Sequence, residues 1–277
     1  MNKTKDTNTA CILCSNGSFT KQFNKSGWDI VRCDSCGLEF VYPLPTERVV
    51  DDYYNKHKQS SKVRIATYLK TRVSRNRRDQ RKLKLLEGIQ GNKGRILDIG
   101  CGMGLFVKNA SDRGWTAEGI DLDKEMIEYG KNAFGVNLSC TDLNDFRLPD
   151  GYFDAITMFN LLDHLRRPLD FLKEVERILK PNGIIYMNLH DAGGWKAKTY
   201  RENWGAYCPP GHLYYYTLDT LEALVNKAGL KFLMVPGVNL KEGIKMILAK
   251  KDTPRQISKF RKKIEKYVYA CVQTLKL

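Results

Sequence analysis

Residues 95–104 read RILDIGCGMG, and this stretch decides the fold of the chain. An apolar run carries an acid, Asp98, and is followed by three glycines at alternate positions, Gly100, Gly102 and Gly104. The pattern is typical of a buried strand that turns sharply into a helix beneath a bound nucleotide, because a glycine backbone can approach a ligand closely. Other residues of the sequence are needed to identify the nucleotide.

Strand-like and helix-like runs alternate from residue 94 onward, which predicts parallel βαβ units. We expect strands in RILDIG, TAEGIDLD, NLSCTDL, YFDAITMFN and IIYMNL, a P-N-G turn at 181–183, and intervening helices such as KEMIEYGKNAFG and PLDFLKEVERILK. A further helix is expected at 218–228. Two last runs, LKFLMVPGV and GIKMILAKK, are expected to pair as an antiparallel hairpin at the sheet edge.

The glycine spacing alone does not identify the nucleotide. A dinucleotide site wants G-x-G-x-x-G with an acid about 20 residues on, and here Asp121 is well placed but the spacing is G-x-G-x-G. Asp98 stands where a carboxylate would repel a pyrophosphate but receive the ammonium of an amino-acid-bearing ligand. Asp142 follows the third strand, where it can accept from an adenine amino group. The predicted sheet ends in a hairpin, whereas a dinucleotide-binding fold continues with a second βαβ half.

These features together resemble the class I S-adenosylmethionine-dependent methyltransferases over about residues 80 to 250. DIGCGMG is similar to that family's first motif, GIDLD to its ribose-binding strand end, TDLNDF to its adenine loop, and FDAITMFNLLDHLRRP to its fourth strand and following loop. The resemblance implies a doubly wound, Rossmann-like α/β fold with a seven-stranded sheet. It implies S-adenosylmethionine as cofactor and methyl transfer as activity.

The resemblance also implies the cofactor-binding residues. Asp98 would orient the amino group, Asp121 the two ribose hydroxyls and Asp142 the adenine edge, while the backbone would approach the cofactor at Gly100, Gly102 and Gly104. Simpler structural roles exist for two of these acids, since Asp121 can cap the following helix and Asp142 can be a turn residue. We expect Asp123 to be the cap.

Methylation of a hydroxyl needs a base, and histidine is the usual one. The chain has four histidines, at 57, 164, 190 and 212. His164 lies in the loop after the fourth strand, where the family places residues beside the reacting methyl, and His212 lies in an aromatic-rich insertion from 190 to 217 that can fold over an acceptor. These two are the predicted catalytic residues, ahead of His190. The alternative is that His164 caps a helix and the aromatics only pack.

Four of the eight cysteines form C-x2-C-x18-C-x2-C and predict a structural Zn²⁺ site. The ligands would be Cys11, Cys14, Cys33 and Cys36. Each C-x-x-C turn can aim two thiolates at one ion, and a segment of about 40 residues needs such a metal to fold. The alternatives are chance spacing of reduced thiols and a redox pair.

The motifs divide the chain into four parts: a zinc ribbon (1–45), a basic helical linker (46–92), the methyltransferase domain (93–250) and a basic amphipathic C-terminal helix (251–277). The net charge is +15, and residues 62–84 alone hold ten Lys or Arg and one Asp. That segment reads either as a plain surface helix or as a docking face for phosphate. The C-terminal helix can lie on an anionic membrane, or pack onto the core or a second subunit.

Three functions fit these observations. The first is methylation of a sugar, glycan precursor or other small molecule, as in methyltransferases that share an N-terminal C-x-x-C ribbon. The second is methylation of RNA through the ribbon and the basic ends, although the chain lacks the Asn/Asp-Pro-Pro-aromatic tetrad of base-amine methylases. The third is a scaffold without catalysis. With no apolar leader or membrane span in the sequence, we expect a cytoplasmic protein, peripheral to the inner membrane face if the C-terminal helix binds lipid.

Overall fold

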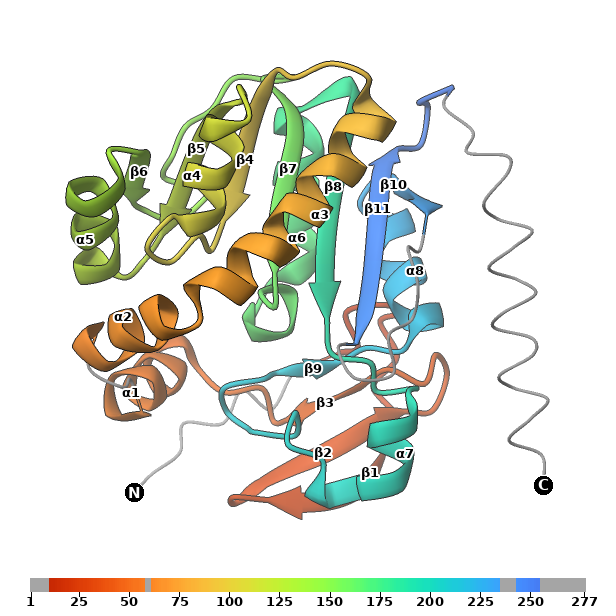
Figure 1. The fold of residues 1–277 in the computed structure, drawn as a ribbon. Coiled ribbons are helices and arrows are strands. Elements are labelled where there is room, and N and C mark those ends of the chain that lie inside the picture. Colours follow the sequence, from red (N-terminus) through yellow and green to blue (C-terminus); the bar gives the residue numbers. More distant parts are fainter. Residues whose placement is uncertain (1–9, 58–60, 235–242, 255–277) are drawn as a thin grey trace.

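The computed structural model describes residues 10–57, 61–234 and 243–254, and it contains two sheets (Figure 1). The larger is seven-stranded, with the order β10-β11-β8-β7-β4-β5-β6. Its strands are β4 (Arg95–Ile99), β5 (Thr116–Asp121), β6 (Asn137–Cys140), β7 (Phe153–Phe159), β8 (Leu179–Leu189), β10 (Leu230–Met234) and β11 (Ile244–Lys250). The doubly wound α/β fold predicted from the sequence is therefore confirmed.

The central strands are parallel and the last two are antiparallel. β4 lies between β5 and β7 in parallel register, so that Asp98 is flanked by Gly119 and Thr157. β11 pairs antiparallel with both β8 and β10, which confirms the predicted edge hairpin. The apolar runs of β4 and β7 are buried along nearly their whole length, as strands covered on both faces must be.

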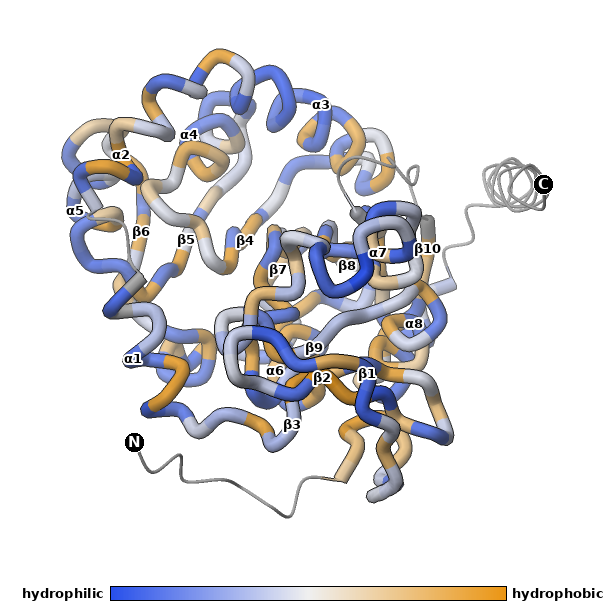
Figure 2. The backbone as a smooth tube through the Cα atoms, turned by 90° about the horizontal axis from the view of Figure 1, so that it is seen from below, coloured by the Kyte–Doolittle hydropathy of each residue, from blue (hydrophilic) through white to orange (hydrophobic). Residues whose placement is uncertain are grey.

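Helices cover both faces of this sheet. Leu83 and Leu86 of α3 (Arg72–Gln90) join α4 (Leu105–Asp112) and α5 (Lys124–Phe134) in one apolar cluster on one face. On the other face, α6 (Pro168–Ile178) and α8 (Leu218–Lys227) pack into a second cluster. α3 is mostly hydrophilic, and of its apolar residues Leu83 and Leu86 are buried, so only part of its surface enters the core (Figure 2).

The smaller sheet has the order β1-β2-β3-β9 and lies at the carboxyl-end side of the larger one (Figure 1). β1 (Phe19–Lys25), β2 (Trp28–Cys33) and β3 (Glu39–Tyr42) are consecutive, but β9 (Tyr214–Tyr215) comes from the insertion. The cysteine-rich segment therefore does not form its sheet alone. The division of the chain at residue 45 stays a prediction.

Two local expectations differ from the structure. The basic segment expected as one helix is broken at Thr71 into α2 (Ser61–Lys70) and α3, preceded by α1 (Glu47–His57). The P-N-G residues at 181–183, expected as a turn before the strand, lie inside the range of β8. They bulge out of it, because the pairing with β7 passes from Leu179 opposite Phe153 directly to Ile184 opposite Ala155. The predicted C-terminal helix lies outside the described residues from 255 onward. Within the described ranges, no helix is long and apolar enough to cross a membrane.

Candidate active site

The loop after β4 turns through three glycines. Gly100, Gly102 and Gly104 all have positive φ angles, of 77°, 56° and 74°, a region that side chains with a Cβ avoid. Gly104 is the N-cap residue of α4, and a Cβ added there would lie only 2.8 Å from the Leu138 side chain. The alternating glycines thus belong to the turn itself.

Asp98 is buried at the end of β4, with 3% of its surface exposed, and it lines the large cavity described below. One carboxylate oxygen accepts a hydrogen bond of 2.6 Å from the Thr157 hydroxyl. Burial raises the pKa of Asp98 to about 7. In the part of the chain that the structure describes, no cationic side chain lies within ion-pairing distance of Asp98, so its carboxylate is available to a cationic ligand.

The other acids of the predicted cofactor site hold the backbone in place. Asp121 accepts the backbone N–H of Gly102 over 2.8 Å with one oxygen and that of Asp123 over 2.9 Å with the other. A carboxylate has about four acceptor sites, so Asp121 can still receive two hydroxyls. Asp123 caps α5 by accepting from the Met126 N–H, as expected. Asp142 is exposed and accepts from the Asp145 N–H over 2.9 Å, the geometry of a turn residue, and its adenine contact stays a prediction.

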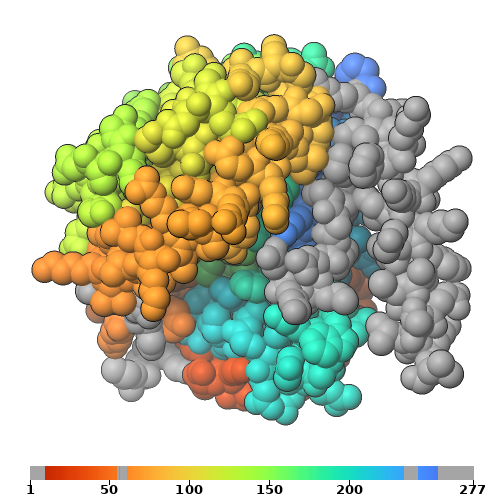
Figure 3. All heavy atoms as spheres, viewed as in Figure 1, coloured from red at the N-terminus to blue at the C-terminus, as the bar shows by residue number. Residues whose placement is uncertain are grey.

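A cavity of about 1060 Å³ opens beside Asp98 and Gly100. One wall is α3, the floor is the carboxyl ends of β4, β7 and β8, and the far wall is the insertion, with Tyr200, Asn203 and Trp204. In Figure 3 the α2–α3 helices (orange) and the insertion (teal) face each other across the front of the molecule, with β11 (blue) visible between them. Ligand sites of parallel α/β sheets lie at this edge, and typical ones measure about 300 to 1,000 Å³.

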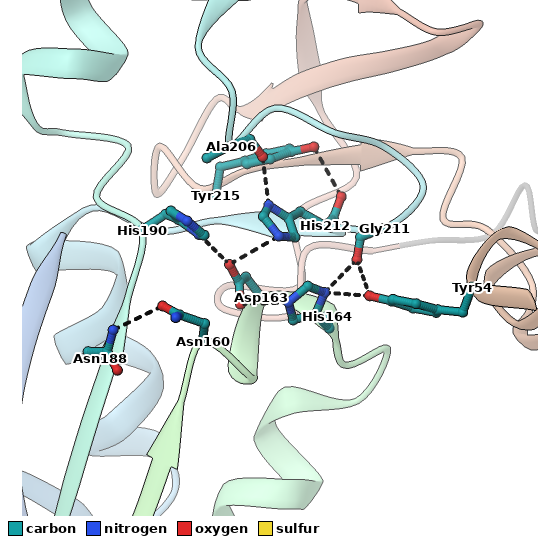
Figure 4. Close-up of polar contacts among 10 residues, drawn as sticks. All are labelled: Tyr54, Asn160, Asp163, His164, Asn188, His190, Ala206, Gly211, His212 and Tyr215. Atoms are coloured by element: carbon teal, nitrogen blue, oxygen red, sulfur yellow. Dashed lines mark hydrogen bonds and ion pairs between the residues drawn. The ribbon is translucent and has the colours of Figure 1, made fainter. Parts of the chain in front are cut away.

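Three histidines surround one buried acid at the edge of this cavity (Figure 4). Asp163, only 2% exposed, lies in the one-turn helix Leu162–His164 after β7. Its Oδ2 is 2.9 Å from His190 Nδ1 and 3.9 Å from His212 Nε2, while its Oδ1 is 3.8 Å from His164 Nε2. Burial opposes ionisation of Asp163, but the hydrogen bond from His190 and the nearby imidazoles lower its pKa below its usual value.

The two predicted catalytic histidines lie behind this acid, away from the cavity. His212 is 8% exposed, and its Nδ1 donates to the Ala206 carbonyl over 2.7 Å. Burial lowers the pKa of His212 to about 4. His164 Nδ1 lies 2.9 Å from the Gly211 carbonyl and also contacts the Tyr54 hydroxyl. Neither residue is part of the cavity wall.

His190, which the sequence ranked lower, does line the cavity. It follows β8 directly, at the same sheet edge as Asp98. Because an ionised carboxylate only accepts hydrogen bonds, Nδ1 of His190 donates to Asp163, and Nε2 of the neutral ring is left as a proton acceptor. The signal for His190 was its position at the end of a parallel strand, but its partner Asp163 follows a different strand.

The aromatic insertion divides into two parts. Tyr207, Tyr214, Tyr215 and Tyr216 are buried, and Tyr215 and Tyr207 pack in one apolar cluster with Ile30 and Val41 of the small sheet. Trp195 and Tyr200 are exposed. Packing therefore accounts for most of the aromatic residues, while Tyr200 and Trp204 are the ones that reach the cavity.

The four cysteines of the two C-x-x-C pairs converge. Cys11 Sγ is 3.5 Å from Cys36 Sγ, and Cys14 Sγ is 3.4 Å from Cys33 Sγ. All four sulfur atoms lie within 4.8 Å of one another. A tetrahedral ion with Zn–S bonds of about 2.3 Å places its sulfurs about 3.8 Å apart, so the donor set and spacing fit zinc.

Asp163, His190 and His212 form a second group whose possible metal-ligand atoms all lie within 4.8 Å of one another.

Comparison with known proteins gives a consistent result. A family model described as a methyltransferase domain matches residues 68–235. The putative methyltransferase YqeM of Bacillus subtilis (strain 168) is 30% identical over 117 residues, which cover 39% of this chain and 47% of that protein. A ubiquinone biosynthesis O-methyltransferase of Coxiella burnetii is 29% identical over 113 residues, with coverages of 39% and 48%. The chain thus spans about half the length of the curated relatives it matches.

Two solved structures share the fold. The Burkholderia thailandensis 1,6-didemethyltoxoflavin-N1-methyltransferase, solved with 1,6-didemethyltoxoflavin and S-adenosylhomocysteine, has a TM-score of 0.55 at 14% identity, covering 84% of this chain and 99% of that one. The magnesium protoporphyrin IX methyltransferase of Synechocystis PCC 6803, solved with S-adenosylhomocysteine, has a TM-score of 0.57 at 14% identity. The match covers 74% of this chain and 100% of that one.

Proposed function

This chain belongs to the methyltransferase domain family, and on that premise we propose that it transfers the methyl group of S-adenosylmethionine to a small-molecule acceptor, such as a sugar or glycan precursor. The observation that carries the proposal is the buried carboxylate of Asp98 beside an open glycine turn, at the wall of a cavity of about 1060 Å³. The cavity's size leaves room for an acceptor next to the cofactor.

The residues present fit the cofactor. Asp98 would receive the ammonium group, Asp121 the ribose hydroxyls, and Asp142 the adenine edge, with backbone approach at Gly100, Gly102 and Gly104. The fit rests on two observations: Asp98 is a buried acid with no cation paired to it among the described residues, and Asp121 keeps acceptor capacity after fastening Gly102. When bound, the cofactor supplies an electrophilic methyl group on a sulfonium, and the protein has to align the acceptor with that methyl in a site shielded from water.

His190 is the base that this geometry favours. Its Nδ1 donates to Asp163 over 2.9 Å, which would leave Nε2 to take the proton of an acceptor hydroxyl. Asp163 stabilises the imidazolium that results, as a buried carboxylate does in other acid–base sites. A hydroxyl is the acceptor group that gains most from such a base.

His212 and His164, the two histidines predicted to be catalytic, are proposed here as positioning residues. The hydrogen bond from His212 Nδ1 to the Ala206 carbonyl fixes the ring beside Asp163. His164 packs on His212 with ring centroids 4.5 Å apart. Together they hold the acid that orients His190, and they help to close the insertion over it.

A structural zinc ion at Cys11, Cys14, Cys33 and Cys36 is part of the proposal. Four cysteine ligands leave no open coordination position, so the ion would stabilise the fold and take no part in the reaction. The spacing of the sulfurs, 3.4 and 3.5 Å within the two closest pairs, supports it.

The test is methyl transfer itself. Purified protein is incubated with methyl-labelled S-adenosylmethionine and a panel of small molecules that includes free sugars, sugar phosphates and nucleotide-linked sugars, with bulk RNA as a separate arm. The proposal predicts label in a small molecule and no label in RNA. Label in RNA that is abolished by RNase would instead establish the RNA alternative.

A further inference from the structure

The wall of the cavity formed by α3 carries four cationic side chains, Arg75, Arg78, Arg81 and Lys82. Their spacing of three, four and seven residues gathers them on adjoining faces of one helix. Arg77 and Lys84 lie on the same helix but are not part of the wall. Part of the basic segment therefore faces the cavity, whereas a plain surface helix would expose its cationic side chains to solvent only.

Two of the four cations have a role already. Lys82 Nζ lies 3.1 Å from Asp79 Oδ1, a partner on its own helix. Arg75 stacks on the ring of Tyr68 at 3.9 Å, and the Tyr68 hydroxyl lies 3.4 Å from where a Cβ on Gly102 would be. Arg75 is therefore on the cofactor side of the cavity, where the single carboxylate of the cofactor can offset one positive charge.

Arg78 and Arg81 are left without a negative partner in the described part of the chain. Both are exposed, and neither makes an ion pair or hydrogen bond with any described residue. Lys196 and Lys245 also line the cavity, and each has interactions of its own. Of the acids in the wall, Asp191 accepts the Gly193 N–H over 2.9 Å, and Asp79 is paired with Lys82. Among the described residues of the wall, cationic side chains outnumber the acids Asp79, Asp98 and Asp191, and Arg78 and Arg81 are paired with none of them.

From this we infer that the acceptor carries a phosphate group, and that Arg78 and Arg81 bind it. The inference rests on the proposed function and names its class of acceptor: a phosphate ester or diphosphate of a small hydroxyl compound. Arg81 follows Arg78 by three positions, which is about 4.5 Å along the helix axis. This spacing suits two guanidinium groups that bind one phosphate or two linked phosphates. Arginine presents paired N–H donors that match phosphate oxygens. His190 and the arginines line the same cavity, so one molecule can reach both.

The experiment is calorimetric titration of protein saturated with S-adenosylhomocysteine, at fixed ionic strength. The probes are glucose 1-phosphate and uridine diphosphate glucose, with glucose as the neutral control and glucuronate as the carboxylate control. The inference predicts that both phosphate probes bind more tightly than glucose and glucuronate. It predicts that the double variant Arg78→Gln/Arg81→Gln weakens phosphate binding by about tenfold or more.

The matched control is Arg77→Gln/Lys84→Gln, which removes the same charge from the same helix outside the cavity and should leave phosphate binding unchanged. Equal loss in the two double variants would overturn the inference, since it would reflect general charge only. So would absence of phosphate binding, or glucuronate or glucose binding as tightly as glucose 1-phosphate. Titration with S-adenosylhomocysteine alone comes first: failure there contradicts the proposed function, whereas cofactor binding without phosphate binding contradicts this inference only.

Discussion

Val41 of the small sheet donates its backbone N–H to the carbonyl oxygen of Leu213 over 2.9 Å. The N–H of Leu213 in turn donates to the carbonyl of Asp163 over 2.8 Å. Two hydrogen bonds therefore connect the sheet that carries Cys33 with the acid that orients His190. The cysteine-rich segment is therefore linked by backbone hydrogen bonds to the proposed active site.

Loss of the metal should then impair catalysis more than cofactor binding. Cys33 is buried, and we expect Cys33→Ser to remove the bound zinc and most methyl transfer. The seven-stranded sheet does not include this segment, so affinity for S-adenosylhomocysteine should change little. Metal content by mass spectrometry, activity and calorimetry check the three statements. Cys140→Ser, at an exposed cysteine outside the cluster, is the control; purified protein without zinc would contradict the site.

Cofactor binding should depend on the ionisation of Asp98. Burial raises its pKa to about 7, and only the carboxylate attracts an ammonium group, so affinity for S-adenosylmethionine should rise as pH increases through 7. Asp98→Asn should bind weakly with a flatter pH profile. Calorimetry between pH 6 and about 8.5 measures both, and a wild-type profile as flat as that of the variant would rule out this role.

The raised pKa of Asp98 also predicts that the free protein becomes less stable as pH increases, while its affinity for the cofactor rises. The folded pKa lies above the unfolded value of about 4, so the favourable contribution of protonated Asp98 is complete below pH 4 and is lost as pH rises through 7. Denaturation midpoints measured across this range should fall more steeply for the wild type than for Asp98→Asn. Parallel curves would contradict the assignment.

Removal of the proposed base should affect turnover and leave cofactor binding intact. We expect His190→Gln to lower kcat by about 100-fold or more, with no change in S-adenosylhomocysteine affinity. Asp163→Asn should cause a loss of similar size, because the ring loses the acceptor that fixes its tautomer. The two losses should not add in the double variant, since the residues act as a unit. Full additivity, or normal turnover of His190→Gln, would exclude the pair.

Two helical glycines should respond to alanine in opposite ways. A Cβ on Gly130 in α5 would lie 2.2 Å from the Met103 carbonyl oxygen, whereas a Cβ on Gly88 in α3 meets nothing within 4 Å. Gly130→Ala should therefore lower the free energy of unfolding by about 1 to 3 kcal/mol, and Gly88→Ala should raise it by up to about 1 kcal/mol. Urea denaturation of the two variants measures the difference, and a stable Gly130→Ala would show that α5 can shift away from the loop.

The individual strands and helices could be predicted because each carries its own periodic signal, and the terminal hairpin because it consists of two adjacent runs. The seven-stranded sheet followed from the resemblance to the methyltransferases. Asp98 and the glycine turn could be predicted because they lie within ten consecutive residues of the sequence. The contact between His190 and Asp163 could not be predicted from the sequence, because the two residues follow different strands and only the pairing of β7 with β8 brings them together. β9 has two residues and carries no periodicity, so its addition to the small sheet could not be read from the sequence.

The central claim is that the turn after β4 binds S-adenosylmethionine through Asp98 and Asp121. Calorimetric titration of the cofactor into wild-type protein, Asp98→Asn and Asp121→Asn tests it most directly. We predict one site per chain in the wild type and affinity lowered by about tenfold or more in each variant, with folding of the variants confirmed by circular dichroism. A wild-type protein that does not bind the cofactor, or folded variants that bind it as tightly as the wild type, would contradict the account.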